Sequence, residues 1–222
     1  MTGIDAGTPD GADFLNRTRT FYDTVVTDYA EHFRDPLPAQ HVDLGVLSAF
    51  AGLVGHGARV ADLGSGPGRV TAYLASLGLS VFGIDLSGGM VEHARREHPG
   101  LSFRQGSMFD LDLPDGELDG VLAWYSIIHT PTERLPGLFA EFARVLAPGG
   151  HLLVGFQVGD EPLRLDRPFG HDVSLDFLRR QPDEVAALLE DAGFEVRARM
   201  VRERDEQRRE TARQASLLTR KR

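Results

Sequence analysis

Hydrophobic and polar positions follow two alternating periods from about residue 58 onward. Short apolar runs such as ARVADL, SVFGID and LDGVLAWYS have the length and composition of buried strands. Longer segments between them, such as LPGLFAEFARVL, repeat their apolar side chains at helical spacing. Turn-forming residues follow three of the predicted helices, at Gly78, Pro99-Gly100 and Pro148-Gly149-Gly150. Strands that alternate with helices in this way predict a parallel sheet with helices on both faces.

The chain on either side of this alternating region predicts further elements. Upstream, TRTFYDTVVTDYAEHF places Phe21, Val25 and Tyr29 on one face of a helix, and the breaker Pro36-Leu37-Pro38 follows it. Downstream, an irregular stretch rich in proline and charge leads into PDEVAALLEDAGF, which has helical spacing. The segments FEVRARMVRER and RQASLLTRK then predict two antiparallel strands joined by a polar turn at 205–209.

Composition narrows the range of functions. The 222 residues include 33 acidic and 24 basic side chains and no cysteine. The acidic balance disfavours nucleic acid as a partner, and the lack of cysteine excludes disulfides, thiolate nucleophiles and cysteine-ligated metals. No apolar run reaches the length of a membrane span, and the polar opening MTGIDAGTPDGAD lacks the features of a secretory signal. We therefore expect a cytoplasmic protein without nucleic-acid or membrane partners.

A glycine-rich turn is the clearest candidate for chemistry. In VADLGSGPGRVTAYLASLG, a buried strand runs into Gly64, Gly66 and Gly68 and then directly into a helix. Such a turn brings backbone N–H groups and a helix N-terminus against a ligand with no side chain between them. Tight turns without a ligand use the same glycines, so the turn alone leaves both interpretations open.

A carboxylate on the next strand favours a nucleoside ligand. Asp85 ends the segment GID, 21 residues after Gly64. This spacing fits a side chain at the tip of the neighbouring strand that accepts hydrogen bonds from both hydroxyls of an adenosine ribose. The alternative role for Asp85 is the N-cap of the following helix, although Ser87 is equally suited to it.

The details of the turn distinguish between nucleoside cofactors. A dinucleotide-binding turn reads GxGxxG, whereas the third glycine comes one residue earlier here. Asp62, two residues before Gly64, would repel a pyrophosphate but would favour a ligand that carries a sulfonium. The charge pattern therefore indicates S-adenosylmethionine.

Together these segments resemble the class I S-adenosylmethionine-dependent methyltransferases, of a small-molecule type similar to actinobacterial metabolite methyltransferases. The resemblance runs from about Val60 to Gln157. DLGSGPG is similar to the family's first motif, GIDLSGGM to its ribose-binding segment, and RQGSMFDLDLPDGELDGVLAWYSIIH to its adenine segment and fourth strand. The resemblance implies a Rossmann-like α/β fold, with a doubly wound, mostly parallel seven-stranded sheet, an antiparallel last strand pair and an N-terminal helical cap.

The resemblance also implies which residues bind S-adenosylmethionine. Asp85 would hold the ribose, Asp62 would support the turn, and Tyr22 on the N-terminal helix would contact the cofactor's carboxylate. The other candidates would surround the methionine part, the adenine and the sulfonium end: Gly64, Ser65, Gly66 and Gly68; Leu86, Met90, Ser107 and Met108; and Trp124 and Tyr125.

Two histidines are candidates for a catalytic base, because imidazole titrates near neutral pH. His129 follows the predicted fourth strand at the ligand-binding edge of the sheet, and packing in a loop is its alternative role. His171 lies in the irregular stretch and could instead pair with Asp172. No histidines and acidic residues have the spacing of metal ligands, so we expect no metal.

The predicted elements fit a single domain. We expect residues 1–13 to be a flexible leader and residues 14–222 to form the domain. Its parts are a helical cap (14–56), a cofactor-binding core (58–157), a lid and acceptor loop (158–181), and a C-terminal helix and strand pair (182–222).

The sequence thus predicts an enzyme that transfers a methyl group from S-adenosylmethionine to an oxygen or nitrogen of a small-molecule acceptor. The protein could also be a homodimer. The main alternative is a non-catalytic or regulatory S-adenosylmethionine-binding protein of the same fold, because a fold does not determine a reaction. A nicotinamide oxidoreductase is disfavoured by the early third glycine.

Overall fold

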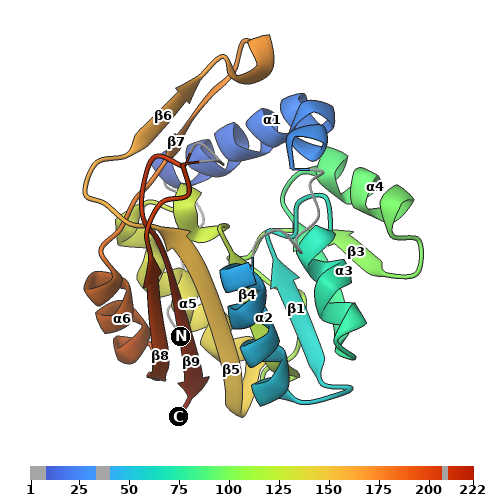
Figure 1. The fold of residues 1–222 in the computed structure, drawn as a ribbon, viewed down its shortest axis with the longest axis vertical. Helices are drawn as coiled ribbons and strands as arrows, with labels where there is room; N and C mark the ends of the chain where they lie inside the picture. Colours follow the sequence, from blue (N-terminus) through green and yellow to red (C-terminus); the bar gives the residue numbers. More distant parts are fainter. Residues whose placement is uncertain (1–8, 34–40, 207–209) are drawn as a thin grey trace.

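A seven-stranded sheet forms the centre of the protein (Figure 1). The computed structural model describes residues 9–33, 41–206 and 210–222. The strand order is β3-β2-β1-β4-β5-β9-β8, and only β9 runs opposite to its neighbours. The strands are β1 (Arg59–Leu63), β2 (Ser80–Asp85), β3 (Ser102–Gln105), β4 (Leu118–Trp124), β5 (Leu146–Gln157), β8 (Phe194–Arg202) and β9 (Gln214–Lys221). The predicted seven-stranded, mostly parallel sheet with an antiparallel last pair is confirmed.

Helices cover both faces of this sheet. On one face, α2 (His41–Val54) and α3 (Arg69–Ser76) bury their apolar side chains against β1, β4 and β5. On the other face, α5 (Leu135–Val145) and α6 (Pro182–Asp191) pack on the same sheet. The short helix α4 (Gly88–Glu97) packs against β3 at the edge. Burial on both faces explains why β1 and β4 are continuous apolar runs.

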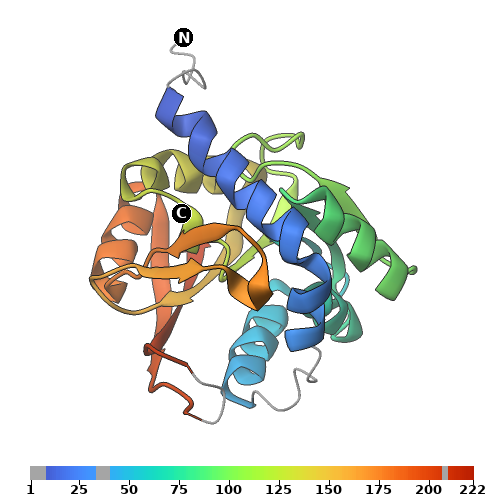
Figure 2. The same cartoon turned by 90° about the horizontal axis from the view of Figure 1, so that it is seen from above.

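Helix α1 (Pro9–His32) lies across the carboxyl ends of the parallel strands (Figure 2). Asp23 fixes it there, because its Oδ1 accepts hydrogen bonds from Ser87 Oγ at 2.5 Å and from the Gly89 N–H at 3.1 Å. The helix begins at Pro9, inside the segment 1–13 expected to be a leader. Phe14 gives the physical reason: it is buried and packs edge-on against Phe109, with 5.7 Å between ring centroids.

Residues 158–181, expected to be an irregular loop, contain a β-hairpin above the same edge of the sheet (Figure 1). Its strands are β6 (Leu163–Asp166) and β7 (Ser174–Phe177). Leu165 pairs with Leu175 across the hairpin, and Leu163 pairs with Phe177. Each strand is short and lies among prolines and charged residues, so its alternation of apolar side chains is hard to recognise in the sequence. The expected breaker at 36–38 and part of the expected turn at 205–209 lie outside the described residues.

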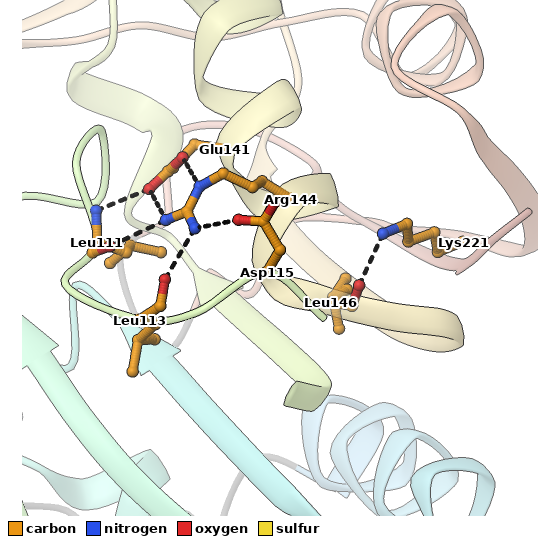
Figure 3. Close-up of polar contacts among 7 residues, drawn as sticks. All are labelled: Leu111, Leu113, Asp115, Glu141, Arg144, Leu146 and Lys221. Atoms are coloured by element: carbon orange, nitrogen blue, oxygen red, sulfur yellow. Dashed lines mark hydrogen bonds and ion pairs between the residues drawn. The ribbon is translucent and has the colours of Figure 1, made fainter. Parts of the chain in front are cut away.

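Arg144 on α5 holds the loop that follows β3 (Figure 3). Its guanidinium donates hydrogen bonds to the carbonyls of Leu111 and Leu113, at 2.9 and 2.8 Å. It also pairs with Asp115 at 2.7 Å and with Glu141 at 2.8 Å. This loop starts at the end of β3, so Arg144 connects the helix layer to the ligand-binding edge of the sheet.

Arg144→Ala is expected to lower the free energy of unfolding by about 2 kcal/mol, because several charge-assisted hydrogen bonds are lost together. Urea unfolding measures the change. Arg164→Ala is the control, since the exposed Arg164 pairs only with surface groups around Asp166 and Asp176 and its loss should change stability little. Equal effects of the two substitutions would contradict this role of Arg144.

Candidate functional site

The glycine turn between β1 and α3 has a backbone that only glycine adopts readily. Gly64, Gly66 and Gly68 have φ angles of 77°, 53° and 84°. A Cβ on Gly64 would lie 2.3 Å from Ser126 Cβ, so the turn packs directly against the chain that follows β4. Gly66 has nothing within 4 Å of the position of a Cβ, so this part of the turn faces open space. The turn therefore packs against the protein at Gly64 and is open to a ligand at Gly66.

Asp85 at the end of β2 connects to this turn. Its Oδ2 accepts a hydrogen bond from the Gly66 N–H, and its Oδ1 accepts one from the Ser87 N–H, both at 2.8 Å. The N-cap of α4 is Ser87, whose Oγ accepts from the Met90 N–H at 3.1 Å. The capping alternative for Asp85 is thus wrong. Burial raises the pKa of Asp85 to about 6.

Asp62 lies beneath the turn and is almost completely buried. It accepts a hydrogen bond from Thr71 Oγ1 at 2.6 Å, which joins the end of β1 to the first turns of α3. Burial raises the pKa of Asp62 to about 7, and the negative charge of Asp85 adds to the shift. The turn therefore has two acidic side chains whose ionised forms would be favoured by a nearby positive charge.

The raised pKa of Asp62 predicts a dependence of stability on pH. The folded protein holds a proton on Asp62 up to about pH 7, whereas the unfolded chain loses it near its ordinary value of 3.8. This contribution to stability is fully present below about pH 4 and is lost as the pH rises through 7. Relative to wild type, Asp62→Asn should therefore gain stability on the order of 2 kcal/mol between pH 5 and 7. Urea unfolding at several pH values tests this, and a constant difference would contradict it.

Two adjoining cavities open at this edge of the sheet. The smaller, of about 110 Å³, lies between α1 and the ends of β2 and β3. The larger, of about 500 Å³, lies beneath α1 and the hairpin. Both are lined by Tyr22, Tyr29, Gly64, Gly66, Trp124 and Tyr125, so the two cavities adjoin at these residues.

The structure brings together nearly all of the predicted cofactor-binding residues. Five of them line the smaller cavity only: Asp85, Leu86, Met90, Ser107 and Met108. Asp62 and Ser65 line the larger one. Gly68 is the exception and lines neither cavity. It is the N-cap residue of α3, and a Cβ there would lie 2.7 Å from Phe103 Cζ, so the need for glycine at this position is structural.

His129 and Tyr22 form a hydrogen-bonded pair beside the smaller cavity. His129 Nδ1 lies 3.2 Å from the carbonyl oxygen of Asp176, and a carbonyl only accepts, so Nδ1 carries the proton. Burial lowers the pKa of His129 to about 4, which keeps the imidazole neutral at pH 7. Nε2 is then an acceptor, and the Tyr22 hydroxyl donates to it at 2.8 Å. The lone pair that a base would use is already occupied by Tyr22.

His171 lies away from both cavities. Its Nε2 is 2.8 Å from Asp28 Oδ2 on α1, so its acidic partner is Asp28 and not the neighbouring Asp172. Both side chains are more than a third exposed. This pair joins the hairpin to the outer surface of α1, which gives His171 a structural position.

Sequence reasoning missed a buried ion-pair cluster on the wall of the larger cavity. Arg202 at the end of β8 pairs with Asp43 at 3.0 Å and with Glu210 at 2.7 Å. Asp43 is 159 positions from Arg202, too far for any sequence motif to connect the two. Arg69, the first residue of α3, also lines the cavity, and its place directly after the glycine turn was a signal that could have identified it.

Within residues 9–33, 41–206 and 210–222, no group of three or more histidine and acidic side chains could hold a metal ion. None of the helices in these ranges has the length and apolar character that crossing a membrane requires.

The sheet order, the glycine turn after β1 and the carboxylate at the end of β2 define a nucleoside-binding α/β protein. The family described as "Methyltransferase domain" matches residues 60–150. A probable S-adenosylmethionine-dependent methyltransferase of Mycolicibacterium smegmatis is 34% identical over 143 residues, which cover 63% of this chain and 53% of the relative. A demethylmenaquinone methyltransferase of Beutenbergia cavernae is 34% identical over 160 residues, covering 62% and 66%.

Among solved structures, the 1,6-didemethyltoxoflavin-N1-methyltransferase of Burkholderia thailandensis has a similar fold. The TM-score is 0.73 at 21% identity, with 98% of this chain and 93% of that chain covered. Residues 60–150 thus match a methyltransferase domain, and the chain is similar in sequence and fold to S-adenosylmethionine-dependent methyltransferases, the resemblance that the sequence predicted. The chain spans between about half and two thirds of the length of these two curated relatives.

Proposed function

We propose that the protein transfers a methyl group from S-adenosylmethionine to an oxygen or nitrogen of a small molecule. The observation that carries this proposal is the Asp85 carboxylate, held against the glycine turn and facing the smaller cavity. One Asp85 oxygen accepts a backbone hydrogen bond from Gly66 and the other accepts one from Ser87, and an ionised carboxylate has lone pairs for more. Two ribose hydroxyls would donate to them.

The other residues of the smaller cavity fit the adenosine part of the cofactor. Leu86 and Met108 would flank the adenine, with Met90 beside them and Ser107 at its polar edge. Two buried hydroxyls beside the turn, Ser65 Oγ and Ser126 Oγ, have no hydrogen-bond partner among the described residues. Buried polar groups are rarely left unpaired, so these hydroxyls support the presence of a polar ligand at the turn.

The charges around the turn fit the methionine part. The bound cofactor supplies a methyl group on a positively charged sulfur. Asp62 would favour that charge, and Trp124 and Tyr125 would line the sulfonium end. Arg69 follows the turn and lines the larger cavity, so it is suited to the cofactor's carboxylate. Tyr22 was expected to make that contact, but its proton is donated to His129.

The larger cavity would hold the acceptor. Alignment of the acceptor and exclusion of water are the main requirements of an in-line displacement. Helix α1 and the hairpin cover the cavity and would provide both. The cofactor would supply the methyl group: a bond from the acceptor atom to the methyl carbon would replace the carbon–sulfur bond, whose electron pair would stay on sulfur, and the acceptor's proton would be released to bulk solvent. A homodimer, a cytoplasmic location and the lack of nucleic-acid partners stay predictions from the sequence.

The test is transfer of label from methyl-labelled S-adenosylmethionine to a panel of phenols, amines and carboxylates. Labelled product is expected with at least one class of acceptor. In parallel, calorimetric titration should show that S-adenosylhomocysteine binds and NADH does not. Preferred binding of NADH would overturn the proposal. Binding of S-adenosylhomocysteine without transfer across the panel would instead favour a regulatory protein that binds the cofactor.

A further inference from the structure

Tyr22 offers a ligand only a hydrogen-bond acceptor. The hydroxyl has one proton, and that proton is donated to His129 Nε2. The direction of this bond is fixed by the Asp176 carbonyl, which holds the imidazole proton on Nδ1. The pair is tightly packed, with the His129 ring 4.7 Å from the ring of Phe177, centroid to centroid. A group that binds to the Tyr22 oxygen must therefore donate a hydrogen bond.

Tyr22 is placed between the two cavities. It lines both of them, as do Trp124 and Tyr125 at the end of β4. Of the two cavities, His129 lines only the smaller one. An acceptor in the larger cavity would thus meet Tyr22 near the sulfonium end of the cofactor, where the reacting atom must lie.

Arg202 in the larger cavity is not available to an acidic acceptor. All five of its N–H groups already donate, to Asp43, Glu210 and the Glu203 carbonyl. The cluster of one arginine and two carboxylates has an excess of negative charge, and Asp43 is only 4% exposed. A carboxylate acceptor would be repelled by the cluster and would find no free donor on it.

Much of the wall of the larger cavity is apolar and aromatic. Phe21 and Phe177 pack edge-on, with 6.2 Å between centroids, and Leu163 and Leu165 of the hairpin lie on the same wall. Among the described residues of this wall, the other arginine is Arg69, which the proposed function gives to the cofactor's carboxylate. These surroundings fit a flat, uncharged ring system better than a polar acid.

We propose that the acceptor is an uncharged, flat molecule of the phenol or N–H heterocycle class, and that its reacting O–H or N–H donates a hydrogen bond to the Tyr22 oxygen. This inference rests on the proposed function and names its substrate class. His129 is a positioning residue in this arrangement: it holds the Tyr22 proton away from the ligand and takes no proton from the acceptor. Carboxylic acids are excluded as acceptors.

The test uses three probes with one ring system, titrated calorimetrically into protein saturated with S-adenosylhomocysteine. The probes are 2-naphthol, which has a hydroxyl donor, 2-methoxynaphthalene, which has none, and 2-naphthoate, which is a carboxylate. We expect 2-naphthol to bind about fivefold more tightly than 2-methoxynaphthalene, the ratio that one hydrogen bond supplies. 2-Naphthoate should bind most weakly. Equal or tighter binding of 2-naphthoate, or no binding of any probe, would overturn the proposal.

Variants of Tyr22 and His129 test the two roles separately: Tyr22 as the group that accepts the ligand's hydrogen bond, and His129 as the residue that orients Tyr22. Tyr22→Phe should make 2-naphthol bind no better than 2-methoxynaphthalene while leaving the affinity for S-adenosylhomocysteine unchanged. His129→Leu should have the same effect, because Tyr22 is no longer oriented. His129→Gln keeps an acceptor for the Tyr22 proton and should restore most of the 2-naphthol preference, whereas a glutamine could not replace a base in methyl transfer.

Two further outcomes are decisive. A tenfold loss of S-adenosylhomocysteine affinity in Tyr22→Phe would assign Tyr22 to the cofactor's ammonium group and would overturn the acceptor assignment. If His129→Gln behaves like His129→Leu, the positioning role fails. Failure of the proposed function looks different: the wild-type protein would then not bind S-adenosylhomocysteine, or would bind it and transfer no label to any acceptor of the panel.

Discussion

Gly64→Ala is expected to destabilise the protein by about 4 kcal/mol, the sum of left-handed backbone strain and overpacking. The φ angle of 77° is unfavourable for alanine, and its Cβ would lie 2.3 Å from Ser126 Cβ. Neither side can move easily, because Ser126 is buried directly after the central strand β4. Urea unfolding and thermal denaturation measure the loss.

Two companion variants separate strain from clash. Gly66→Ala has a φ angle of 53° and open space around its Cβ, so it should cost only about 1 kcal/mol, from the backbone alone. Adding Ser126→Gly to Gly64→Ala removes the clashing atom and should recover part of the lost stability. If the double variant recovers nothing, the contact between the turn and Ser126 is not what requires glycine at position 64.

Asp85→Ala is expected to weaken binding of S-adenosylhomocysteine about 30-fold, which corresponds to about 2 kcal/mol for hydrogen bonds to a charged group. The substitution also frees the Gly66 N–H, so the turn loses the partner that orients it. Calorimetric titration measures the affinity. Trp124, the only tryptophan, lines both cavities, and its fluorescence gives a second readout of binding.

Asp119→Ala is the matched control for Asp85→Ala. Asp119 also accepts a backbone N–H at 2.8 Å, from Arg59, but at the amino end of the central strands. Asp119→Ala should lower stability by an amount similar to Asp85→Ala and leave the affinity for S-adenosylhomocysteine unchanged. An unchanged affinity in Asp85→Ala, or an equal loss in both variants, would refute the assignment of Asp85 to the ribose.

Much of the fold could be predicted from local sequence patterns. The runs that became β1, β2 and β4 are apolar because both faces of the sheet are covered, and glycine or proline marks where helices end. The hairpin of β6 and β7 could not be predicted because each of its strands has four residues, too few for a clear period among prolines and charges. The start of α1 was placed too late in the chain because the helix is fixed by Phe14 against Phe109, a contact between distant segments.

In the ligand site, too, features within neighbouring elements could be predicted from the sequence, and contacts between distant segments could not. The glycine turn and Asp85 could be recognised because one strand–helix–strand unit, β1–α3–β2, sets the spacing between them. The Tyr22–His129 pair joins residues 107 positions apart, and Asp43 and Arg202 are 159 positions apart. Such pairs leave no spacing signal, since each depends on how α1, the hairpin and β8 are placed over the sheet.

The sequence by itself therefore determined the sheet, the glycine turn and the class of cofactor, because these follow from hydrophobic periodicity and from contacts within neighbouring elements. Only the tertiary structure decided what His129 and His171 contact, which proton Tyr22 holds and which charges line the larger cavity. A side chain's partner and pKa depend on burial and on groups brought together from distant parts of the chain, and that information exists only once the chain is folded.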